Sequence, residues 1–152
     1  MQAWKQKVLE AWPEFHEALQ EAEDRLEFWI MLRTEFIEIT YGTRDEDALR
    51  RYYACAWWAV DGSEDEETGC AAVLNFYEDL LDTERVRQEM HHYVTAEQFD
   101  RLKEIWRYGR SEEEYATLLI DLQRFREGRH LVDKVLPRHA FKGISSRSKP
   151  KQ

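Results

Sequence analysis

One run of the chain is apolar around the whole circumference of a helix. Between Tyr52 and Val60 the sequence places no charged side chain on any helical face. A helix of this kind is normally buried by neighbours on every side. The run is much shorter than the roughly 20 apolar residues that a membrane-spanning helix needs. We therefore predict a central helix, buried inside an all-α domain, and no membrane-spanning segment.

A recurring Ser/Thr-x-x-Glu/Gln signature marks the starts of helices. In this capping box the first hydroxyl accepts the backbone N–H of the fourth residue, whose own side chain accepts the N–H of the first. The signature begins at four positions, each after a break and before apolar residues at helical spacing: Thr43, Ser63, Thr95 and Ser111. The predicted helices cover about 44–60, 64–81, 96–108 and 112–126. The expected stops are Asp61-Gly62, Gly109 and Gly128.

The N-terminal part also has helical periodicity. Residues 2–11 predict an amphipathic helix with Trp4 and Val8 on its apolar side, and Pro13 suits the first turn of the next helix. Apolar residues then keep helical spacing as far as residue 41, in one helix or in two, because Asp24 followed by Glu27 has the form of an internal cap.

Two further segments are predicted to be helical. The run from Phe28 to Leu32 is apolar all round, so we expect it to lie deep against the central helix. A shorter helix is expected between Asp82 and Val94.

Composition and spacing indicate an irregular helical bundle. Six glycines and three prolines are too few for the many turns of a β-sandwich or barrel. We predict about six to eight helices in a single domain, residues 1–137, followed by a basic tail, residues 138–152, with the composition of a disordered extension. Thr43, Ser63 and Thr83 recur every 20 residues, which leaves a short α-solenoid of helical hairpins as the alternative.

The charge is strongly acidic outside the tail. The net charge is -9, but residues 138–152 hold five basic side chains and no acid. Residues 1–137 therefore carry 17 basic and 31 acidic side chains, a net charge of -14. Such a surface repels nucleic acid and anionic lipid and attracts basic partners. The N-terminus has no signal-peptide pattern, so a cytoplasmic location is predicted.

No motif for catalysis or cofactor binding is visible. Cys55 and Cys70 lie in apolar helical stretches outside any metal-binding spacing, which predicts buried, unreactive thiols. The glycines lie scattered at helix ends and form no phosphate loop. We predict no catalytic residue and no cofactor, and an enzyme has no positive support.

A metal site is the alternative from a different class. Glu89 and His92 have the i, i+3 spacing that places two ligands on one helical face, as in helical di-iron sites. Those sites use the motif twice and add a Glu from each of two further helices, for which Glu35 and Glu38 are the candidates here. Because the motif occurs once, we predict no metal ion and keep Glu89 and His92 as the runner-up.

The predicted partner-binding residues surround the end of the central helix. Acidic side chains at a helix start complement the helix dipole, and they also suit a basic protein partner. Tryptophan is favoured at interfaces, and two adjacent ones point about 100° apart on a helix. The candidates are Trp57, Trp58, Asp61, Glu64, Asp65, Glu66 and Glu67. A homodimer that buries an aromatic surface is a third hypothesis.

The chain resembles a family of small all-helical bacterial proteins of unknown function, over about residues 12–82. The resemblance lies in Pro13-Glu14-Phe15, an apolar helix over Phe28–Tyr41, and the acidic junction Asp61–Glu67 that leads into Ala71–Leu80. It implies a bacterial, all-helical, non-enzymatic domain, and by analogy an immunity-type or partner-binding role.

Overall fold

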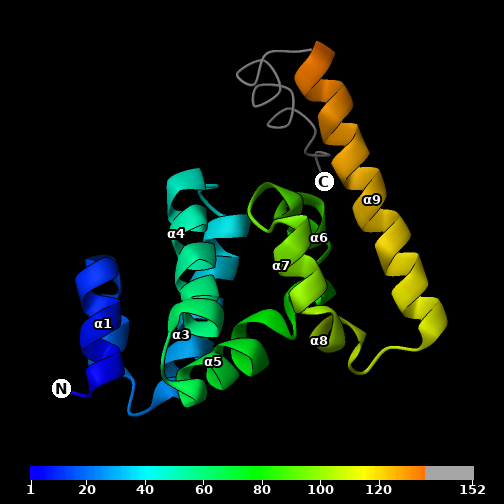
Figure 1. Cartoon of the computed structure of the whole chain (residues 1–152). Helices are drawn as coiled ribbons and strands as arrows, with labels where there is room; N and C mark the ends of the chain where they lie inside the picture. The colour runs from blue at the N-terminus through cyan, green and yellow to red at the C-terminus, as the bar shows by residue number, and fades with distance from the viewer. Residues whose placement is uncertain (136–152) are drawn as a thin grey trace, which may run out of the picture. The chain divides into compact units, whose positions relative to one another are not determined.

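The computed structural model describes residues 1–135, with side chains up to residue 128, and every regular element in that part is helical. The predicted all-α class is therefore confirmed. The chain divides into two compact units, residues 1–110 and a second one that begins at Ser111 (Figure 1). The predicted boundary at residue 137 and the predicted tail, residues 138–152, lie outside the described residues.

Residues 13–41 form two helices. The first elements are α1 (Ala3–Ala11), a 3-10 turn (Pro13–Phe15), α2 (His16–Glu21) and α3 (Arg25–Tyr41). Pro13 occupies the first position of its turn, as predicted. Before α3 the carboxylate of Asp24 accepts the N–H of Glu27 at 2.9 Å, and the Glu27 side chain accepts the N–H of Glu23 at 2.6 Å. The internal cap at Asp24 is thus confirmed.

Two helices of the first unit end in π-helical segments. α4 (Glu46–Trp57) continues as a π-helix over Trp58–Gly62, and α5 (Glu66–Ala72) continues as one over Val73–Tyr77. Their wider turns are closed by N–H groups that donate five residues back, from Ser63 to the Trp58 carbonyl at 2.8 Å and from Glu78 to the Val73 carbonyl at 3.0 Å. Short π-helical turns of this kind are frequent at functional sites.

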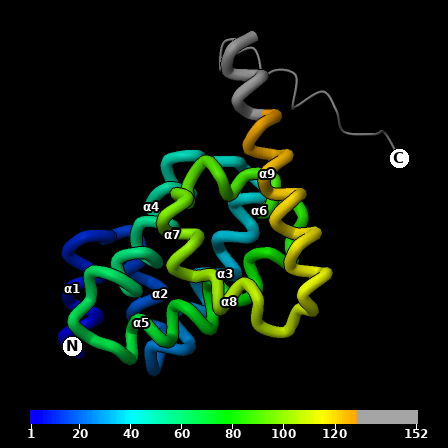
Figure 2. The backbone as a smooth tube through the Cα atoms, turned by 45° about the vertical axis from the view of Figure 1, so that its right-hand side comes forward, coloured from blue at the N-terminus to red at the C-terminus, as the bar shows by residue number. Residues whose placement is uncertain are grey.

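Short helices complete the first unit. They are a 3-10 turn (Leu80–Asp82), α6 (Glu84–Glu89), a second 3-10 turn (Met90–His92), α7 (Ala96–Arg101) and α8 (Lys103–Arg107). The helices predicted over 64–81, 82–94 and 96–108 are each divided into shorter segments. α7 lies beside α4 in both views of the backbone (Figures 1 and 2).

Two of the four predicted capping boxes form. At Thr95 and Gln98 both reciprocal bonds are present. The second box forms at Ser111. At Thr43 and Ser63 the prediction is wrong, because an aspartate two residues later accepts an N–H group in the first turn of the helix instead. Asp45 accepts the N–H of Ala48 before α4, and Asp65 accepts the N–H of Glu67 before α5. Thr43 and Ser63 therefore lie outside their helices.

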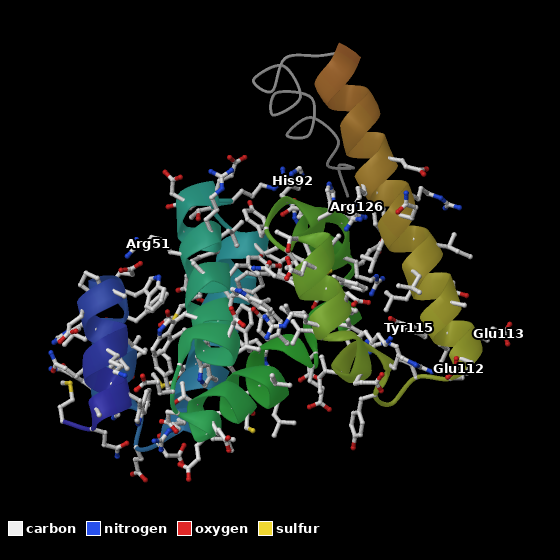
Figure 3. The ribbon with its side chains drawn as sticks, viewed as in Figure 1. Arg51, His92, Glu112, Glu113, Tyr115 and Arg126 are labelled. Carbon is white, nitrogen blue, oxygen red and sulfur yellow. The ribbon has the colours of Figure 1, made fainter. Side chains whose placement is uncertain are left out.

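The second unit contains α9 (Glu112–Val135). Its capping box is confirmed, since the Ser111 hydroxyl accepts the N–H of Glu114 at 3.1 Å and the Glu114 carboxylate accepts the N–H of Ser111 at 2.6 Å. Glu112 and Glu113 lie in the first turn and Arg126 lies further along the helix (Figure 3). The predicted stop at Gly128 is wrong, because α9 runs through it; one interior glycine costs about 1 kcal/mol, which a long helix tolerates.

An aromatic cluster fills the core of the first unit. Phe36 of α3 contacts both Tyr53 of α4 and Phe76 of the second π-helix edge-on, each with ring centroids 5.1 Å apart. The Trp29 ring also contacts Phe76 edge-on, with ring centroids 6.1 Å apart. Edge-to-face pairs of this kind are favoured beyond the area that they bury. Three helices that are separate in the sequence are thereby joined through Phe76.

The prediction of complete burial is wrong for both apolar runs. In α4, Tyr52, Tyr53, Cys55 and Ala56 are buried, but Ala54 is exposed and Trp57 and Trp58 are half-buried. In α3, Ile30 is 41% exposed. Neighbouring elements cover part of the circumference of each helix, so some apolar side chains remain at the surface.

Among residues 1–135, no helix combines the length and the apolar character that are needed to cross a bilayer.

Candidate functional site

An open groove of about 490 Å³ runs along the exposed side of α4. One wall comes from α4 and the π-helix that follows it, and the other from the second 3-10 turn, Tyr93 and α7. The lining residues are Arg50, Tyr53, Ala54, Trp57, Trp58, Asp61, Gly62, His92, Tyr93 and Gln98. The groove therefore brings together three of the predicted site residues, Trp57, Trp58 and Asp61.

Helical spacing explains why one side of α4 forms the wall. Arg50, Ala54, Trp57 and Asp61 follow one another at intervals of three or four residues, which places them along one face. The methyl group at Ala54 is small and exposed, so it leaves a gap between larger neighbours. Ala54 and its larger neighbours Arg50 and Trp57 all line the groove.

Two stacked tyrosines lie beneath the opening. The rings of Tyr53 and Tyr93 are nearly parallel, at an angle of 9°, with centroids 5.1 Å apart. Burial raises the pKa of the Tyr53 hydroxyl well above its ordinary value. The phenol therefore stays neutral even above the pH at which an ordinary tyrosine ionises, and the stacked pair gives the groove an aromatic floor without charge.

Both tryptophans are held in place by neighbours. The Arg101 guanidinium lies 5.0 Å from the centre of the Trp57 ring and forms an ion pair with Asp61. The Trp58 ring packs against Trp12 with centroids 5.7 Å apart. A Cβ atom at Gly62 would lie 3.0 Å from the Trp58 ring, so a larger residue there would press the ring out of its place by a few tenths of an ångström.

The predicted acidic cluster is mostly engaged in ion pairs within the chain. Asp65 and Glu67 both bind Arg25, with oxygen–nitrogen distances of 2.6 and 3.0 Å, and Glu64 lies 3.7 Å from Lys7. Burial acts to raise the pKa of Asp65, but hydrogen bonds from Arg25 and Thr68 outweigh it and leave the pKa below its ordinary value. These acids therefore stabilise the start of α5 as well as carrying negative charge.

The acids also divide between two places. Glu64 and Asp65 line a second open hollow, of about 660 Å³, together with Trp4, Lys7 and Arg25. Glu66 is exposed in the first turn of α5. The seven predicted residues thus do not form one continuous site, and the tryptophans share a groove with Asp61 alone among the acids.

The runner-up metal ligands are engaged in other contacts. The Glu89 carboxylate accepts a hydrogen bond from Arg44 at 3.1 Å and lies 3.4 Å from Arg85. His92, labelled in Figure 3, is exposed, and it lines the groove. Glu35, proposed as a facing ligand, accepts the Tyr52 hydroxyl at 2.8 Å. Among the side chains that the structure describes, no three metal-ligating residues gather as an ion would require.

The two cysteines differ in exposure. Cys55 is buried, and burial raises the pKa of its thiol, as expected for an unreactive core cysteine. Cys70 is exposed, so the prediction that both thiols are buried is wrong for this residue. It lies on the outer side of α5, whose buried residues Ala71 and Ala72 face the core.

Comparison with protein-family models, curated proteins and solved structures found no match. The resemblance to the helical bacterial family therefore stays a prediction.

Several groove residues were missed by sequence reasoning. Arg50 and Tyr93 carry no motif, and Gln98 was singled out only as the end of the Thr95 capping box. Tyr93 and Gln98 lie some 40 residues from α4 along the chain. Only tertiary packing brings them to the same place. The one available signal was Ala54, a small residue on the same face as Arg50 and Trp57.

Proposed function

We propose that this protein is a non-enzymatic module that binds another protein, and that the groove beside α4 is its contact site. The observation that carries the proposal is the pair Trp57 and Trp58, both half-buried, in the wall of an open groove. Tryptophan side chains in such partly enclosed positions commonly supply most of the binding energy of an interface.

The rigidity of the groove supports this role. Trp57 is held by Arg101, Trp58 by Trp12, and the floor by the Tyr53–Tyr93 stack. Ordering a flexible side chain at an interface costs about 0.5–1.5 kcal/mol, so rings that are fixed before binding lose less on association. The groove is thus prepared for an apolar or aromatic side chain of a partner.

The charge favours a basic partner. The net charge of -9 attracts positively charged proteins over distances of about 10 Å at moderate salt. Such attraction raises the association rate more than the final affinity. The acids at the start of α5, Glu64 to Glu67, contribute to this field although most of them are paired. We include the predicted cytoplasmic setting in the proposal, and the free thiols of Cys55 and Cys70 suit its reducing conditions.

A comparative capture experiment tests the proposal. The full chain is immobilised, incubated with cell lysate at low and at high salt, and the retained proteins are quantified. The same is done with Ala54→Arg, which fills the groove from an exposed position without removing a buried contact. We expect at least one protein whose retention falls about tenfold with Ala54→Arg, and falls again at high salt.

Ala116→Arg is the matched control, because Ala116 is also an exposed helical alanine but lies in α9. It should retain the same protein as the unmodified chain. If every retained protein binds Ala54→Arg and the unmodified chain equally, the groove is not the partner site and the proposal is wrong.

A further inference from the structure

A second apolar surface lies on α3, apart from the groove. Leu26, Ile30, Thr34, Ile37 and Tyr41 follow one another at intervals of four, four, three and four residues. At 100° per residue they all fall within roughly 40° of Ile30 around the helix axis. Leu26 is 48% exposed, Ile30 41% and Tyr41 51%. These five residues, here called the α3 stripe, extend for about 22 Å, almost the whole length of the helix.

The α3 stripe is not needed for the core. The buried residues of α3 are Phe28, Trp29, Leu32, Phe36 and Thr40, which lie on the other side of the helix. Single exposed apolar residues are normal on a soluble protein, but here three exposed apolar side chains and the half-buried Ile37 share one face of the helix, which marks an interaction surface. Thr34 between them turns its hydroxyl to the Ile30 carbonyl, at 3.0 Å. The spacing of the row matches the apolar seam of a second helix laid along the first.

The edges of the α3 stripe differ in charge. Glu27 and Glu38 lie along one edge, at roughly 60° and 80° from Ile30, and both are exposed. Arg33 lies at the opposite edge, where it forms an ion pair with Asp79. The stripe therefore offers one acidic edge and one edge whose charge is already balanced.

A second copy of the chain fits this surface poorly. Two α3 helices packed parallel would set each acidic edge against an Arg33 that is already paired with Asp79. Packed antiparallel, Glu27 of each copy would lie on the same edge as Glu38 of the other. Like charges that close are destabilising, and the net charge of -9 repels a second copy as a whole. An apolar helix with a basic edge meets the same stripe without this cost.

We infer that the α3 stripe binds an amphipathic helix of about 15 residues from a different protein, with apolar residues along one seam and Lys or Arg beside it. The basic residues of that helix pair with Glu27 and Glu38. This inference does not depend on the α4 groove, and the two surfaces can be tested separately.

Two labelled synthetic peptides of about 18 residues serve as probes. They share a Leu/Ile seam at helical spacing, and one carries Lys at the flanking positions where the other carries Glu. Fluorescence anisotropy is measured as the full chain is titrated into each. We expect the Lys peptide to bind about tenfold more tightly than the Glu peptide, and Glu27→Gln with Glu38→Gln to remove most of that difference.

Substitutions on and away from the α3 stripe test whether the peptide binds there. Ile30→Lys should weaken binding of the Lys peptide about tenfold, whereas Ile120→Lys, at an exposed isoleucine in α9 that is 62% exposed, should not. Ala54→Arg should also leave this binding unchanged, which separates it from the groove. Equal binding of both peptides, or unchanged binding by Ile30→Lys, would overturn the inference. So would a dimer in sedimentation of the unmodified chain that Ile30→Lys dissociates, because the stripe would then bind a second copy.

Discussion

Gly69 sets how closely α5 approaches the π-helical end of α4. A Cβ atom there would lie 3.0 Å from the carbonyl oxygen of Ala59, a backbone atom of the segment that carries Trp58. The backbone cannot rotate away as a long side chain would. The position of the groove wall therefore depends on the absence of one methyl group.

We predict that Gly69→Ala destabilises the protein. Overpacking costs about 1–3 kcal/mol, whereas alanine gains about 1 kcal/mol in helix propensity, so the net loss is up to about 2 kcal/mol. Urea denaturation followed by circular dichroism measures it. Gly128→Ala is the matched control, because nothing lies within 4 Å of its added Cβ, and it should be neutral or stabilising. If both substitutions stabilise to the same extent, the close contact at Gly69 does not exist.

Glu89 gives a prediction about pH. Burial raises its pKa above the ordinary value of 4.5, although Arg85 partly offsets the effect. As pH rises through 4.5 the unfolded chain ionises first, so the wild-type protein loses stability until the folded carboxyl also ionises. The stability of Glu89→Gln relative to wild type should therefore increase between pH 4 and pH 7, measured from thermal unfolding midpoints at each pH.

Asp65→Asn should show the opposite dependence of stability on pH from Glu89→Gln. The pKa of Asp65 lies below its ordinary value of 3.8 in the folded state. The Asp65 carboxylate therefore stabilises the fold above pH 3.8, and this stabilisation is lost as pH falls through the folded pKa. As pH rises through the same range, Asp65→Asn should become less stable relative to wild type. Parallel trends for the two substitutions would contradict the assigned environments.

At the scale of the helix, capping chemistry was predictable in kind but not always in position. The signature was correct at Thr95 and Ser111, where no aspartate follows within three residues. It was wrong at Thr43 and Ser63, which both have an aspartate two residues later. Asp and Ser rank equally as caps, and the carboxylate also interacts favourably with the helix dipole. Where both are available, the aspartate is the cap.

This difference can be measured at α4. Asp45→Ala removes the acceptor of the Ala48 N–H and should cost about 1 kcal/mol. Thr43→Ala removes a hydroxyl outside the helix and should cost less than about 0.5 kcal/mol. Chemical denaturation of both variants at neutral pH gives the two values. A larger cost for Thr43→Ala would place the cap where the sequence signature first suggested.

At the scale of the whole molecule, the sequence was sufficient for the class of fold and for part of the candidate site. Helix starts and apolar periodicity are local, so the all-α class followed from them. Which apolar side chains are buried was harder to predict from the sequence, because a helix such as α3 can be apolar on a side that no neighbour covers. The lining of the groove was harder still to predict, because His92 and Gln98 are brought next to α4 only by tertiary packing.

The central claim is that the groove beside α4 receives a partner. Hydrogen exchange of the full chain, with and without the protein that the capture experiment retains, tests it most directly. We predict slower exchange over residues 50–62 and over residues 92–98 in the complex. Protection confined to other segments, with exchange in these two unchanged, would contradict the claim.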